Sequence, residues 1–97
     1  MDKKDHPSWL KPFTRYRKGD LRDTNLGFMD LRRVDLRDTN LSGANLSDTD
    51  LTGADLHNAD LSFANLSGAD LTDTDLRRTD LRGQNLDDLK SSGAIIN

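Results

Sequence analysis

The chain has 97 residues, the size of one small domain, and a formal net charge of only −3. It has no Cys, which excludes disulfides, a thiol nucleophile and a Cys-ligated zinc site. We also expect no signal peptide and no membrane span, because no apolar run is long enough for either. All 17 acidic residues are Asp, which favours turns where Glu favours helices, so the composition indicates a turn-rich fold.

Residues 1–18 differ from the rest of the chain in composition. They carry a local net charge of +4 and three of the five aromatic residues, Trp9, Phe13 and Tyr16, with Leu10 between them. In one interpretation these side chains cap the open end of a core. In the other, the segment is a basic-aromatic arm that binds nucleic acid or another protein. We expect the cap.

From Asp20 onward, a leucine recurs at every fifth residue over fourteen repeats. Asp or Asn precedes each leucine, and in most repeats a small or β-branched residue stands two positions before it. On an α-helix, steps of five would advance the leucine by about 140° each time, and on a strand they would alternate faces. Each pentad must therefore turn the chain and return its leucine to one interior. The expected core leucines are Leu21, Leu26, Leu31, Leu36, Leu41, Leu46, Leu51, Leu56, Leu61, Leu66, Leu71, Leu76, Leu81 and Leu86.

This run, residues 20–88, resembles the motif of the pentapeptide-repeat family: a small residue, Asp or Asn, Leu or Phe, and two further residues. The resemblance implies an all-β fold, a right-handed quadrilateral β-helix solenoid with four pentads in each coil. Fourteen repeats would then make about 3.5 coils, closed by terminal caps. We expect an N-terminal cap or arm at 1–18, the pentapeptide-repeat β-helix at 19–89, and a C-terminal cap or degenerate repeat at 90–97.

The residues before the leucines support a coil of 20 residues. Asn occupies this position at four places spaced by 20, which would stack in one column. Stacked amides can hydrogen-bond along a column, whereas stacked carboxylates repel one another. The neighbouring Asp columns therefore need compensating charge. The expected Asn column is Asn25, Asn45, Asn65 and Asn85.

Among the residues expected to face outward, the arginines and phenylalanines are the candidates for contacts with a partner. A 20-residue coil would stack Arg37, His57 and Arg77 beside an Asp column. Either the arginines offset stacked Asp and discourage end-to-end strand pairing, or they form an anion-contacting or partner-docking face. Phe28 and Phe63 fill the last slot of their pentads, which should face solvent. The candidate contact residues are Phe28, Arg32, Arg33, Arg37, His57, Phe63, Arg77, Arg78 and Arg82.

The pattern does not indicate catalysis, because the repeat spaces the Asp residues evenly and singles out no acid–base pair. We expect no catalytic residue, no cofactor and no metal. The favoured function is a non-catalytic protein-interaction or structural module in the cytoplasm, with an unidentified protein partner or a homodimer through a solenoid end. The alternative, implied by the resemblance, is a DNA mimic that binds an enzyme such as gyrase, since residues 19–89 contain 15 Asp and 7 Arg. We expect no membrane association and no direct binding to nucleic acid.

Overall fold

Parallel backbone bridges join residues that are 20 apart, from Arg15 and Asp35 to Asp75 and Ile95. The N–H of Leu26 donates to the carbonyl of Asn45 at 2.8 Å, and the N–H of Asn45 donates back to the carbonyl of Thr24 at 2.9 Å. Because leucines recur every five residues, a 20-residue coil holds four pentads and has four faces. Face 1 holds Leu21, Leu41, Leu61 and Leu81, face 2 holds Leu26, Leu46 and Leu66, face 3 holds Leu31, Leu51 and Leu71, and face 4 holds Leu36, Leu56 and Leu76.

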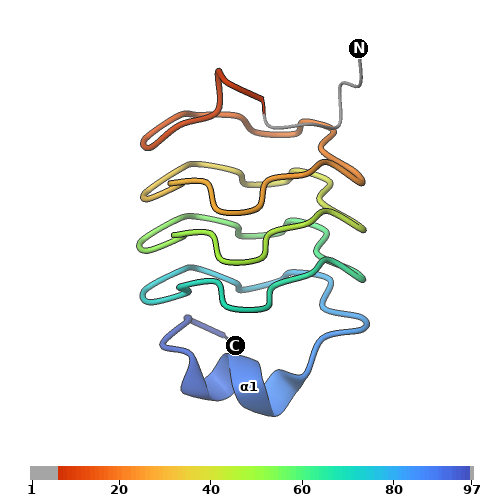
Figure 1. Ribbon diagram of the computed structural model, residues 1–97. Helices are drawn as coiled ribbons and strands as arrows, with labels where there is room; N and C mark the ends of the chain where they lie inside the picture. The colour runs from red at the N-terminus through yellow and green to blue at the C-terminus, as the bar shows by residue number, and fades with distance from the viewer. Residues whose placement is uncertain (1–6, 97) are drawn as a thin grey trace.

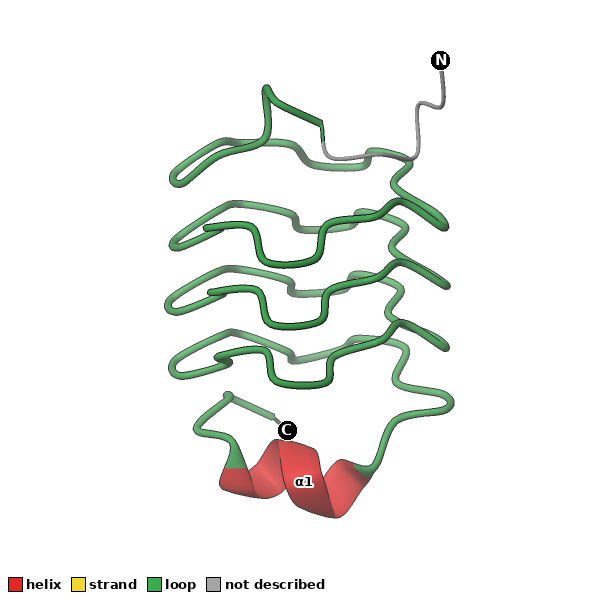
Figure 2. Ribbon diagram, in the orientation of Figure 1, coloured by secondary structure: helices red, strands yellow, loops and turns green. Residues whose placement is uncertain are grey.

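The structure, a computed structural model, describes residues 7–96. These residues form a stack of coils with the N-terminal segment at one end and the helix α1 (Leu86–Ser91) at the other (Figure 1). Figure 2 shows α1 as the one helix of the described range, the rest being loops and turns. This helix is too short to cross a membrane. The molecule measures 37 × 25 × 23 Å.

Every pentad turns the chain in the same way. The N–H of Thr24 donates to the carbonyl of Leu21 at 3.2 Å, and Asp23 between them has a φ of 55°. This combination matches a type II β-turn, whose third residue needs a positive φ. In residues 7–96, positive φ occurs only in this last slot of the pentad. Gly fills the slot at 43, 53, 68 and 83, whereas Phe28 and Arg33 adopt a conformation that side chains of their kind seldom take.

The leucines form the core together with the residues two positions before them. The leucines from Leu21 to Leu61, with Leu71 and Leu76, are buried, and Val34, Ala44 and Thr74 lie beside them. Three leucines differ from the prediction. Leu66 and Leu81 are only partly buried, because no further leucine coil covers them. Leu86 is 51% exposed, because it lies in the first turn of α1 instead of the core.

The first coil begins about five residues earlier than the sequence predicted. Residues 14–18 form a pentad on face 4 with Tyr16 in the leucine slot, and the Tyr16 N–H donates to the Asp35 carbonyl at 2.7 Å. Leu10 is buried at 2% and Tyr16 packs against the core, so these two side chains close this end. Trp9 packs on Tyr16 with ring centroids 4.7 Å apart, whereas Phe13 is 69% exposed. Residues 1–6 of the predicted arm lie outside the described residues.

At the other end, α1 replaces the coil on faces 2 and 3. Asn85 is its N-cap, and the side chain accepts the N–H of Asp88 at 3.1 Å. Asn85 is therefore not part of the Asn column, and the cap begins at Leu86 rather than at residue 90. A helix forms here because Ser91 stands where the repeat requires a leucine, while Asp87 and Asp88 in the first turn suit the helix dipole.

After α1 the chain rejoins face 4 in the original register. The N–H of Ile95 donates to the carbonyl of Thr74, and the N–H of Leu76 donates to the carbonyl of Ile95, both at 2.8 Å. Leu89 is buried at 5% and Ile96 packs against the core. These two side chains seal the bottom of the solenoid.

Candidate interaction surface

The Asp or Asn before each leucine stabilises the corner of its own pentad. In all thirteen pentads from Asp20 to Asp80, its side-chain oxygen accepts the N–H two residues later, at 2.9–3.3 Å. This is an Asx turn, which needs an oxygen that both Asp and Asn possess. Stacking alone does not predict this role, for which the signal in the sequence is that Asp or Asn occupies the position in every pentad.

In the part of the Asn column that the structure describes, one of the predicted hydrogen bonds between stacked side-chain amides is present. The Nδ2 of Asn45 donates to the Oδ1 of Asn25 at 3.2 Å. Among residues 7–96, no hydrogen bond joins the side-chain amides of Asn45 and Asn65. The Oδ1 of Asn65 instead accepts the N–H and the Oγ of Ser67, at 3.0 and 2.6 Å. The Asx turn therefore contributes more to this column than the ladder does.

Five arginines pair with the Asp two residues earlier in their own pentad. In Arg37, Nε donates to Oδ1 of Asp35 and Nη2 to Oδ2, both at 2.9 Å. This hydrogen bond holds the pKa of the Asp35 carboxyl below its usual value of 3.8. The same bidentate geometry recurs in the pairs Arg22–Asp20, Arg32–Asp30, Arg77–Asp75 and Arg82–Asp80. This pairing favours the interpretation that the arginines offset the stacked Asp.

Face 4 extends the pairing across coils. Arg17 lies 3.7 Å from Asp35 of the next coil, and Arg37 lies 3.5 Å from Asp55. The half-exposed His57 follows in the same column, and its backbone N–H donates to Asp55 at 3.0 Å. The face therefore alternates positive and negative groups, and does not offer one continuous positive surface for an anion.

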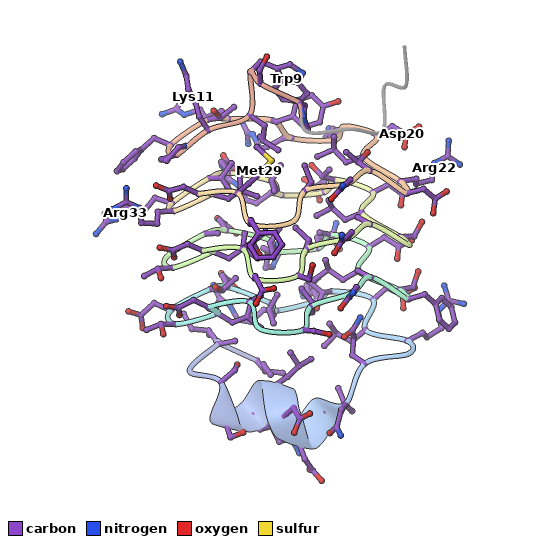
Figure 3. All side chains as sticks on the ribbon, in the orientation of Figure 1. Trp9, Lys11, Asp20, Arg22, Met29 and Arg33 are labelled. Carbon is purple, nitrogen blue, oxygen red and sulfur yellow. The ribbon has the colours of Figure 1, made fainter. Side chains whose placement is uncertain are left out.

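The candidate arginines do not gather in one patch. Figure 3 shows Asp20 and Arg22 together on one wall and Arg33 on the opposite side. Arg33 and Arg78 occupy the last pentad slot, with φ values of 56° and 60°, at different corners of the coil. The side chain of Arg33 lies over Gly53, where an added Cβ would meet its Cγ at 3.2 Å.

Phe28 and Phe63 are exposed at the two edges of face 2, by 77% and 69%. Phe63 ends a pentad of face 1 and Phe28 ends a pentad of face 2, so face 2 lies between their corners. Their exposure was predicted from the pentad slot, and the structure adds that they border the same face. A Cβ on Gly83 would come within 2.7 Å of the Phe63 ring, so this glycine leaves room for the ring.

Face 2 differs from the other faces in charge. In its described coils, the slots on either side of the leucine hold only uncharged residues: Asn25, Asn45 and Asn65 before it, and Gly27, Ser47 and Ser67 after it. Faces 1, 3 and 4 carry both Asp and Arg in these slots. The Ser47 hydroxyl donates to Asn45 Oδ1 at 2.6 Å, so its lone pairs remain available as acceptors. Face 2 is thus a neutral polar strip between two corner columns, one with the exposed Phe63 and Asp23 and the other with the exposed Phe28 and Asp48.

Within residues 7–96, no group of three or more His and Asp side chains is placed to hold a metal ion.

A family model described as pentapeptide repeats (8 copies) matches residues 20–58 and 54–88. The chain therefore belongs to the pentapeptide repeat family. A search of the curated proteins finds no match.

Solved structures of pentapeptide repeat proteins resemble this chain. One is from the thylakoid lumen of Arabidopsis thaliana; it is 34% identical over 64% of this chain, with a TM-score of 0.63. This chain covers 43% of that protein's length. Another, from Nostoc PCC 7120, is 29% identical over the full length of both chains, with a TM-score of 0.50. QnrB1, a plasmid-mediated fluoroquinolone resistance protein, is 19% identical over 86% of this chain and 50% of its own, with a TM-score of 0.43.

Proposed function

We infer that this protein is a non-catalytic protein-interaction module built on a short right-handed β-helix. The observation that carries this inference is the pair of exposed rings, Phe28 and Phe63, at the edges of the neutral face 2. Aromatic side chains supply large contact area, and a surface free of charge is cheap to desolvate. Face 2 is therefore the part of the wall that a protein partner can cover at the lowest electrostatic cost.

Two further features support this function. The repeat fixes Phe28 and Phe63 on a stack of hydrogen-bonded coils, so little conformational entropy is lost at the backbone when a partner binds. Proteins of the pentapeptide repeat family are generally non-enzymatic. The cytoplasmic location and the homodimer through a solenoid end stay predictions.

The test is affinity capture from the native host with matched phenylalanine variants. The Phe28→Ser/Phe63→Ser double variant should lose a protein that the wild type retains. Phe13→Ser is the control, because Phe13 is also 69% exposed in the last slot of a pentad but lies at the corner of faces 3 and 4. Equal retention by all three proteins, or no specific retention by the wild type, would contradict the proposal.

DNA mimicry directed at gyrase is the second candidate function, and the excess of Asp over Arg in residues 19–89 favours it. The longest dimension, 37 Å, corresponds to roughly 11 base pairs at about 3.4 Å each. Five of the seven arginines, however, pair with Asp in the wall and interrupt the negative surface. Inhibition of gyrase supercoiling by the purified protein would favour mimicry over the interaction module, and an unchanged supercoiling rate at large molar excess would reject it.

A further inference from the structure

The backbone ladder stops on face 2 of the third coil. In the coils above, the N–H groups of Leu46 and Asp48 donate to the carbonyls of Asn65 and Ser67, both at 2.8 Å. The equivalent donors one coil later are the N–H groups of Leu66 and Gly68. Within residues 7–96, neither of these has a hydrogen-bond acceptor. An edge with unpaired donors is a template for adding another extended segment.

A cavity of about 430 Å³ lies against these donors. The pentad of Leu66 forms one side of it, and Asn85, Asp88 and Leu89 from the cap line another. Leu66 is only partly buried here, whereas Leu26 and Leu46 above it on face 2 are fully buried. The cavity thus combines two free backbone donors with an incompletely covered apolar side chain.

The repeat shows which segment should fill this space. Asn85, Leu86 and Asp87 are in phase with Asn65, Leu66 and Ser67, and would lie directly below them in a fourth coil. Those residues instead form the cap and first turn of α1, where Leu86 is 51% exposed. The ladder is in register before this break, where Phe63 donates to Arg82, and after it, where Leu76 donates to Ile95. The gap in the ladder therefore extends over faces 2 and 3, where the N–H of Leu71 also lacks an acceptor within residues 7–96, and the vacant position is the face 2 part of this gap.

We propose that this position binds an extended peptide segment of a partner protein by strand addition. The ladder above defines the contacts. The peptide residue below Asn65 accepts from the Leu66 N–H, and the residue two positions later accepts from the Gly68 N–H. The side chain between them points inward and covers Leu66.

The same geometry specifies the chemistry of the peptide. Its central residue is a branched apolar one such as leucine, because the equivalent residues of the coils above are Leu26 and Leu46. Its flanking residues are polar and uncharged, as in Asn45 and Ser47, or basic where they face Asp88. An acidic central residue would be placed against Leu66 without a partner, which is unfavourable.

The experiment is an NMR titration of the full chain with the synthetic peptide acetyl-Ala-Asn-Leu-Ser-Gly-amide. We expect the amide protons of Leu66 and Gly68 to shift downfield, while that of Asp48, which is already paired, stays unchanged. At nine-tenths occupancy, hydrogen exchange at Leu66 and Gly68 should slow by about tenfold, by mass action. The peptide with Asp in place of Leu is the matched control and should produce no shift. No response at these two amides, or an equal response to both peptides, would overturn the proposal.

Two protein variants localise the binding. Leu66→Ala removes the apolar contact and should weaken the peptide at least severalfold. Leu81→Ala changes the other partly buried leucine of the lower coil, on face 1, and should leave the affinity unchanged. Equal weakening by both variants would contradict the assignment. The cavity lies at the lower end of face 2, but neither Phe28 nor Phe63 lines it, so the capture experiment and the titration can fail independently.

Discussion

The pentad is stabilised by side chains that bond their own backbone. Asp50 shows this arrangement: its Oδ1 accepts hydrogen bonds from the N–H and from the Oγ1 hydroxyl of Thr52, at 3.0 and 2.6 Å. Both bonds close the corner before the chain enters the next face. They need an oxygen at this position, and do not need a negative charge.

Asp50→Ala removes both bonds and should lower the free energy of unfolding by about 1–2 kcal/mol. Asp50→Asn keeps the oxygen and should cost less than about 0.5 kcal/mol. Urea unfolding of the two variants measures the difference. An equal loss in both would mean that the charge, and not the Asx turn, stabilises the corner.

The arginine pairs predict how stability depends on pH. The hydrogen bonds from Arg37 and Arg77 lower the pKa values of Asp35 and Asp75 below the ordinary value of 3.8. Because the folded-state pKa values are the lower ones, the stabilisation is complete above about pH 4 and is lost as the pH falls through them. The urea midpoint should therefore decrease in this range, and should decrease less in the Arg37→Gln/Arg77→Gln variant. An identical pH dependence in both proteins would contradict the role of the pairs.

At the scale of the elements, α1 acts through one side chain. Leu89 is buried at 5% and Leu86, three residues earlier, is 51% exposed. Leu89→Ala should lower the free energy of unfolding by about 2–4 kcal/mol, because it opens the bottom of the core. Leu86→Ala should cost less than about 1 kcal/mol. Thermal unfolding of this matched pair tests the cap, and comparable losses would place Leu86 in the core after all.

The helix and a further coil compete for residues 85–92. Ser91→Leu supplies the leucine that the repeat lacks, and should convert the segment into a fourth coil. Helical circular dichroism should decrease, and the amides of Leu66 and Gly68 should become protected from exchange. Ser92→Leu, one position out of phase, should leave both measurements unchanged. Retention of α1 in the Ser91→Leu variant would show that the Asn85 cap and the acidic first turn decide the conformation.

The sequence predicts the repeated part of the molecule well and the two ends of the solenoid less well. The leucines from Leu21 to Leu61 share one slot of the pentad and are all buried, so they could be placed in the core from the five-residue spacing alone. The ends could not be predicted in the same way, because burial there depends on the missing neighbour coil. Tyr16 continues the pattern with an aromatic residue in the leucine slot, and Leu86 departs from the core although it is in phase.

The candidate surface was less predictable than the core. The exposure of Phe28 and Phe63 follows from their slot, but the face between them becomes visible only when the four columns are assembled. The arginines were predicted to lie outside, and their pairing with Asp two residues earlier was missed, because it depends on the corner that brings Nε and Nη2 onto one carboxylate. The cavity between the Leu66 pentad and α1 depends on a helix that the repeat does not predict.

At the scale of the whole molecule, all of these features depend on a coil of 20 residues. The coil places Phe28 and Phe63 on either side of face 2, stacks Arg37 against Asp55, and leaves the position below Leu66 vacant. The absence of Cys from the chain permits a direct test by introducing cysteine pairs. Stacked residues lie about 4.8 Å apart, within the range that a disulfide can bridge.

The decisive measurement is therefore the rate of disulfide formation in two double variants that share one position. Ser47→Cys/Ser67→Cys joins residues 20 apart on face 2, and should oxidise rapidly and raise the melting temperature. Ser47→Cys/Ser62→Cys joins residues 15 apart on different faces, and should remain reduced under the same conditions while the protein is folded. Equal oxidation of the two pairs, or faster oxidation of the second, would contradict the four-pentad coil and the surfaces derived from it.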